Sequence, residues 1–152
     1  MSFVDPTTPN LADFITFCQG QGVTTSDLDP ASPWFGYALT YAQNVALSDP
    51  CDIPSIMYVI AVYNLGLAQL IRIAPDTAPS TFFADMRKQF NLLSFVAGVV
   101  SGSSDQATSQ TLAVGEGLAN LPLSAINLTK TPWGQAYLEY AQMYGPNIVD
   151  YS

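Results

Sequence analysis

The apolar positions of the chain recur with a helical period, and one stretch is apolar on every side. Residues 53–74 read IPSIMYVIAVYNLGLAQLIRIA, and their few polar side chains fall on different sides of a helical wheel. The pattern predicts one helix of about six turns, roughly 30 Å long, with Pro54 at its first position and Pro75 just past its end. A helix that is apolar all round is either a membrane span or the central element of a packed core.

Shorter amphipathic segments lie on both sides of this stretch. Further helices are expected over residues 11–19, 33–47, 80–93 and 132–144. Each begins next to a side chain that commonly caps helices: Asn10, Ser32, Ser80 or Thr81, and Thr131. The sequence therefore predicts a mainly α fold, a helical bundle around the long helix at about 54–74.

For two of these helices the sequence predicts which side chains face the core and which face outward. In the last one, aromatic and small residues from Trp133 to Tyr144 share one side, which is expected to dock on the core. In the helix over 80–93, Arg87 and Lys88 are the only adjacent basic pair of the chain. They are expected on its outer side, where they would meet acidic residues of a neighbour or solvent.

The helical period stops after residue 94. The apolar runs FVAGVV and LAV, at 95–100 and 112–114, flank the polar segment SGSSDQATSQT. This pattern predicts a β-hairpin or an extended loop over about 95–114. A polar segment of this length in a compact domain is usually a binding loop or a mobile one. Its candidate partner-binding residues are Ser101, Gly102, Ser103, Ser104 and Asp105.

Both ends of the chain read as extended. Residues 1–8 form an expected N-terminal arm, and the tail over 146–152 alternates apolar and polar side chains without a strand to pair with. Short tails of this kind often complete a partner's sheet or groove. The candidate partner-binding residues of the tail are Pro146, Asn147, Ile148, Val149, Asp150, Tyr151 and Ser152. The chain length fits a single domain over 1–152 with these two extensions.

Charge narrows the choice of partners. Only 11% of the residues are charged, while 49% are hydrophobic, so much of the surface is expected to be covered by other proteins. Lys and Arg number 4 against 12 Asp and Glu, a net charge of −8 that disfavours nucleic acids and anionic membranes. Asn64, Gln69 and Arg72 interrupt the long apolar stretch, and no basic flank orients it. A buried core helix is therefore preferred over a membrane anchor.

No catalytic or metal-binding motif stands out. The chain has no histidine, the commonest general base. Cys18 and Cys51 are each isolated in the sequence, and we expect them to be small buried residues of a protein in a reducing compartment. The pair Asp27 and Asp29 fits turn and cap chemistry, and the N-terminus lacks the features of a signal peptide. We expect neither an enzyme nor a bound cofactor or metal ion.

Three segments, in this order and spacing, resemble the head–tail connector proteins of tailed bacteriophages, also called adaptor or head-completion proteins. They are AVYNLGLAQLI at 61–71, GVVSGSS at 98–104 and LTKTPWGQAYL at 128–138. The last matches a family pattern of threonine, a small residue or proline, an aromatic, glycine, glutamine or arginine, then an aromatic and leucine. The resemblance covers about residues 32–149.

The resemblance implies a virion protein at the head–tail junction, made in the host cytoplasm during assembly. Such proteins are mostly helical and form a ring, commonly a dodecamer, that binds the portal protein and the neck or tail proteins. The ring extends the channel through which DNA passes without specific binding, and the tail at 146–152 would reach the portal. The alternatives are a tail terminator or another minor virion component, or a small helical enzyme or ligand-binding domain.

Overall fold

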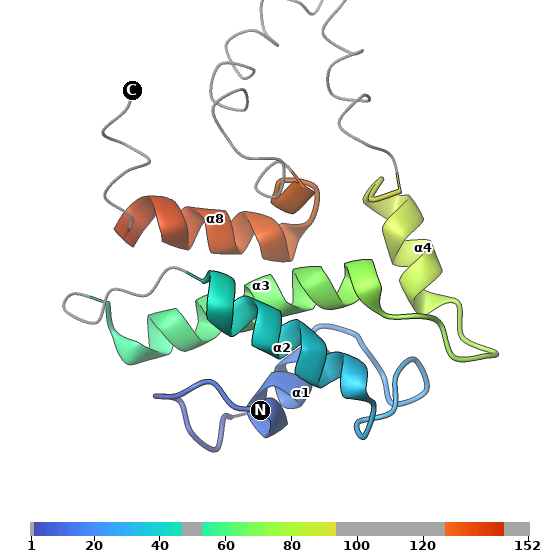
Figure 1. Ribbon diagram of the computed structural model, residues 1–152, viewed down its shortest axis with the longest axis horizontal. Coiled ribbons are helices and arrows are strands. Elements are labelled where there is room, and N and C mark those ends of the chain that lie inside the picture. Colours follow the sequence, from blue (N-terminus) through green and yellow to red (C-terminus); the bar gives the residue numbers. More distant parts are fainter. Residues whose placement is uncertain (1, 47–52, 94–126, 145–152) are drawn as a thin grey trace, which may run out of the picture.

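A computed structural model describes residues 2–46, 53–93 and 127–144 of the chain. These residues are mainly helical and contain no strand. The helices are α1 (Leu11–Gly20), α2 (Pro33–Val45), α3 (Ser55–Ile73), α4 (Phe82–Gln89) and α8 (Pro132–Tyr144) (Figure 1). The hairpin or loop expected over 95–114, with its candidate residues at 101–105, and the tail at 146–152 lie outside the described residues.

Helix α3 contacts each of the other helices. α2 and α8 pack most extensively against it, and α1 and α4 pack against it as well. Figure 1 shows α8 along one side of α3, α1 and α2 on the other, and α4 crossing near its C-terminal end. The 19 residues of α3 lie within the range predicted from the sequence. Pro54 is the residue before the helix and not its first turn, because helical dihedral angles begin at Ser55.

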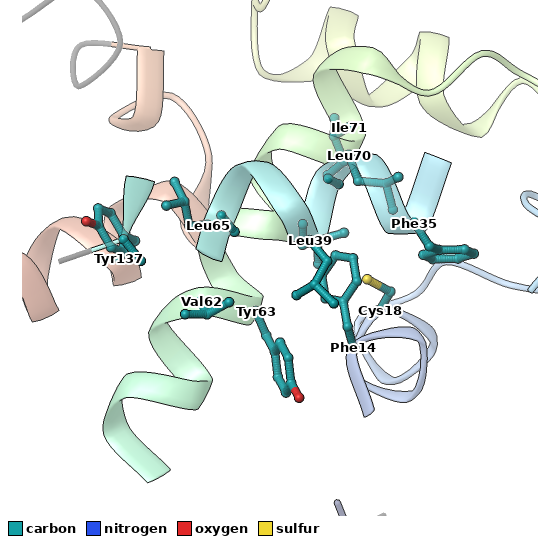
Figure 2. Packing of buried hydrophobic residues seen from close by; sticks show 14 of the residues in the cluster. Phe14, Cys18, Phe35, Leu39, Val62, Tyr63, Leu65, Leu70, Ile71 and Tyr137 are labelled. Carbon is teal, nitrogen blue, oxygen red and sulfur yellow. The ribbon is translucent and has the colours of Figure 1, made fainter. Parts of the chain in front are cut away.

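The packed interior centres on the aromatic ring of Tyr63, from α3. The ring lies 5.7 Å from the Phe14 ring and 5.8 Å from the Phe17 ring, both of α1, and 5.2 Å from the Phe3 ring of the N-terminal arm. Its hydroxyl oxygen accepts a hydrogen bond of 3.1 Å from the backbone N–H of Asn10. Burying a phenol is tolerated when its oxygen finds such a partner. Figure 2 shows Tyr63 and Phe14 in this cluster.

Three predicted caps are confirmed. The Asn10 side chain accepts from the N–H of Asp13, and the Ser32 hydroxyl accepts from the N–H of Trp34. The Thr131 hydroxyl accepts from the N–H of Gly134 in the first turn of α8. These bonds satisfy N–H groups that the helices themselves leave without acceptors.

Helical spacing in α2 puts Trp34, Ala38, Tyr41, Ala42 and Val45 on one side. Most of this side is buried or half-buried, but Val45 is 49% exposed, and Phe35 and Leu39 are buried as well. Ala38 and Ala42 are buried as expected, and their small side chains let α2 approach α3 closely. Because α2 carries large apolar residues on several sides, its sequence pattern does not determine which of them faces α3.

Helix α4 is shorter than predicted and ends at Gln89. Asn91 adopts a positive φ of 57°, and the N–H of Leu92 donates to the carbonyl of Arg87 (2.8 Å). This is the left-handed termination that asparagine tolerates better than most residues. Leu93 therefore lies beyond the helix and is 71% exposed.

Within the described part of the chain, α3 is the one helix long and apolar enough to cross a membrane. The mean hydropathy of its best window is 1.6, and 56% of that window is buried inside the structure. The core helix of a water-soluble protein passes the same test, and contacts with four other helices are typical of such a helix.

Candidate functional site

The residues that the structure describes contain no group of three or more His, Cys, Asp or Glu side chains able to hold a metal ion. Cys18 is a buried free thiol, as expected, and burial raises its pKa far above the usual value. Such a thiol stays protonated and is a poor nucleophile. Cys51 lies outside the described ranges.

The paired carboxylates Asp27 and Asp29 serve the loop that carries them. Asp27 accepts hydrogen bonds from the Thr24 N–H (3.0 Å) and from the Ser80 hydroxyl (2.6 Å), and Asp29 accepts from the Ala31 N–H (2.9 Å). Burial by itself raises the pKa of Asp27, but these hydrogen bonds outweigh it and lower the pKa below its usual value. Both carboxylates act as turn caps, as the sequence predicted.

A third carboxylate, Asp13, holds the N-terminal arm against α1. Its two oxygens accept from the N–H groups of Val4 and Asp5, each at 2.8 Å, and from the Asn10 amide at 2.9 Å. Burial raises the pKa of Asp13, and the three hydrogen bonds lower it by more, so the group is ionised near neutral pH. Its role is structural.

The N-terminal half of α3 carries exposed apolar side chains. Ile56, Met57 and Ile60 are 40%, 36% and 38% exposed, on the N-terminal half of α3. At 100° per residue they fall within an arc of about 100°, so they form one strip, called here the α3 strip. Their neighbours Val59 and Ala61 are buried. The α3 strip is thus the side of this half of the helix that the other described residues leave exposed.

The same side of α3 is covered further along the helix. Leu67 and Ile71, which follow Ile60 by about two and three turns, are fully buried. There α4 contacts α3, and the Arg87 guanidinium donates to the carbonyl of Ile71 (2.9 Å). Only the N-terminal half of α3 therefore presents this side to solvent.

The side chains of the α3 strip are uncharged. Helix α2 has no charged residue, and the only one in α3 is Arg72, in the last turn. Helix α2, whose last residue is the exposed Val45, ends on the side of the molecule where α3 begins (Figure 1). An uncharged apolar area of this kind suits contact with another protein better than contact with water or an ion.

The sequence pattern did not single out the α3 strip. It predicted the whole helix to be core, because a helix that is apolar all round gives no sign of which side is left uncovered. The predicted contact residues, at 101–105 and 146–152, lie outside the described residues, so their position relative to the α3 strip stays a prediction.

We found no match to this chain among protein-family models, curated proteins or solved structures.

Proposed function

We propose that the chain is a structural assembly protein of a tailed bacteriophage. In this proposal it forms a ring at the head–tail junction, joins the portal to the neck or tail, and extends the DNA channel. The observation that carries the proposal is the α3 strip, an uncharged apolar surface on a chain that has few charged residues to cover it. The three segments that resemble connector proteins are the reason for proposing a head–tail connector ring and not another assembly.

The α3 strip supports assembly for an energetic reason. Burying apolar surface contributes about 25 cal/mol per Å², so large exposed apolar side chains favour association. A ring needs a head-to-tail contact, in which two different surfaces of the subunit meet and the rotation closes. The α3 strip is one candidate for such a surface.

The finer architecture belongs to the same proposal. The helices form a bundle around α3, and the segment over 95–114 forms a hairpin or extended loop. The tail at 146–152 contacts the portal, and the loop residues 101–105 contact a partner protein. The net charge of −8 would let DNA pass through the channel without adhering to it.

The proposal is tested by native mass spectrometry and electron microscopy of the full-length protein, with and without its portal protein. We expect closed rings, alone or on the portal. The double variant Ile56→Glu, Ile60→Glu should lose them, because charge in the α3 strip opposes its burial. The matched control is Ala12→Glu, Gln19→Glu, which adds the same charge at exposed positions of α1 and should assemble normally.

Wild-type protein that stays monomeric with and without the portal would refute the proposal. Assembly of the strip variant as well as the control would refute the role of the α3 strip alone. Locating the subunit in a map of the virion separates a connector from a tail terminator or another minor component.

A further inference from the structure

The chain has only 4 Lys and Arg residues, and all of them lie in the described part. Arg72 is in the last turn of α3, and Arg87 and Lys88 are in the last turn of α4. Lys130 is two residues before Pro132, where α8 begins. Residues that are up to 58 positions apart in the sequence, counted from 72 to 130, are thus carried by helix ends.

Printed contacts bring these helix ends together. The Arg87 guanidinium donates to the carbonyls of Ile71 (2.9 Å) and Ala74 (2.8 Å), which fixes the end of α4 against the end of α3. The Lys130 ammonium donates to the carbonyl of Asn91 (3.1 Å), just past α4.

An aromatic contact joins the same elements. The Phe90 ring, which follows α4, lies 5.7 Å from the Trp133 ring at the start of α8. Figure 1 shows α4 beside the C-terminal end of α3, with α8 beginning on that side of the molecule. The helix ends that carry the basic residues of the chain therefore lie together at one end of the described structure, which we call the basic end and define by Arg72, Lys88 and Lys130.

Two of these side chains are available to a partner. Arg72 and Lys88 are exposed, and within the described ranges neither side chain makes a hydrogen bond or ion pair. Arg87 is used inside the molecule, as a cap for α3. The basic end also lies far from the α3 strip, because Arg72 follows Ile56 by 16 residues of helix, about 24 Å.

The rest of the chain is acidic, with 12 Asp and Glu and a net charge of −8. Copies brought together at random would therefore repel one another. Repulsion becomes attraction only when the basic end of one copy meets an acidic surface of the next. Asp29 and Glu139 are exposed acidic residues of the described part and are candidates for such a surface.

We propose that the basic end docks on an acidic surface of a second copy of this chain and so determines which sides of neighbouring subunits meet. This inference rests on the proposed ring. Complementary charges of this kind act mainly on orientation and association rate, and they exclude wrong contacts. DNA is a poorer match, because three exposed or half-exposed cations on a chain of charge −8 give little counterion release.

The test compares two full-length double variants that both have a net charge of −10, two units below the −8 of the natural chain. The first is Arg72→Gln, Lys88→Gln, and the control is Ala12→Glu, Gln19→Glu. Subunit dissociation constants are measured by sedimentation and native mass spectrometry from low salt to about 1 M NaCl, where the Debye length falls to about 3 Å. Circular dichroism checks that both variants fold, and Lys88→Gln alone replaces the first variant if it does not.

We expect the wild-type assembly to weaken at least about tenfold as salt rises. The Arg72→Gln, Lys88→Gln variant should be at least about tenfold weaker at low salt and lose most of this salt dependence, whereas the control keeps it. Equal assembly of both variants, with wild-type rings that are insensitive to salt, would overturn the inference and leave the proposed ring standing. A variant that assembles normally but no longer binds duplex DNA would also overturn it. Wild-type monomers under every condition would overturn the proposed function as well.

Discussion

At the scale of single residues, Gly66 and Gly134 are the two described glycines where a side chain would collide with a neighbour. A Cβ atom built on Gly66 of α3 would lie 2.8 Å from Cε1 of the Phe14 ring, so the ring of α1 rests directly on the helix backbone. A Cβ on Gly134 would overlap the backbone carbonyl of Leu128. A ring can turn aside, whereas a backbone carbonyl moves only with its segment, so Gly134 is the stricter of the two.

We therefore predict that Gly134→Ala lowers the free energy of unfolding by about 1–3 kcal/mol, the usual range for overpacking. Gly36→Ala is the matched control, because Gly36 is also helical and its Cβ would meet no atom within 4 Å. Alanine there should raise the stability by about 0.5–1 kcal/mol. Urea unfolding of both variants measures the difference, and equal effects would show that the segment at 128 does not press on α8.

Asp13 gives a prediction about pH. Its folded-state pKa lies below the usual value of 3.8, because hydrogen bonds from the N-terminal arm outweigh its burial. The ionised group therefore contributes stability above about pH 4, and this contribution is lost as the pH falls through the lowered folded-state pKa. The variant Asp13→Asn should be less stable than wild type at pH 7, and the difference should shrink as the pH is lowered.

Unfolding curves of both proteins between about pH 7 and pH 2 measure this difference. Glu139→Gln is the control, since Glu139 is exposed on α8 and holds no described segment. A constant difference between wild type and Asp13→Asn across that range would mean that the arm is not held by the ionised carboxylate.

At the scale of helices, the corner between α3 and α4 is closed by two side chains. Asp76 accepts from the N–H groups of Phe83 (2.7 Å) and Ala84 (3.2 Å) at the start of α4, and Arg87 donates to two carbonyls at the end of α3. Each pair satisfies backbone groups that a helix end leaves open. The sequence suggested Ser80 or Thr81 as the cap of α4. The Ser80 hydroxyl accepts only from Phe82 N–H, at 3.2 Å, and Asp76 supplies the stronger contact.

Arg87 was expected on the outer side of its helix, and this was wrong. Replacing it by glutamine should cost about 1.5–3 kcal/mol, the range for hydrogen bonds made by charged groups. Lys88→Gln, at the adjacent exposed position, should stay within about 0.5 kcal/mol of wild type.

The measurement is thermal or urea unfolding at a protein concentration low enough to keep the chain monomeric, because assembly raises apparent stability. Equal losses in the two variants would contradict the capping role of Arg87. A loss of stability in Lys88→Gln alone would assign the structural role to Lys88 and not to Arg87.

At the scale of the whole molecule, the described core reaches Tyr137, Tyr140 and Ala141 of α8, and the predicted portal contact follows in the sequence at 146–152. We predict that deletion of 146–152 leaves the unfolding curve and the ring unchanged but abolishes binding to the portal, which a pull-down measures. Replacing the tail by a Gly/Ser segment of equal length should abolish binding equally, because side chains and not length would make the contact.

Local features of the sequence determined where three of the helices begin. Caps such as Asn10, Ser32 and Thr131 act on N–H groups two or three residues away, so their effect can be read without the fold. The mainly α class follows from the same local periods.

Tertiary structure alone decided which sides of these helices are buried. Three observations depend on residues that are distant in sequence. They are the exposure of Ile56, Met57 and Ile60, the exposure of Val45 on the helix that buries Phe35, and the partners of Arg87. A helix apolar on every side fits several packings, and only the placement of α2, α4 and α8 selects one. The same packing brings three helix ends that carry basic residues next to one another, which no local pattern encodes.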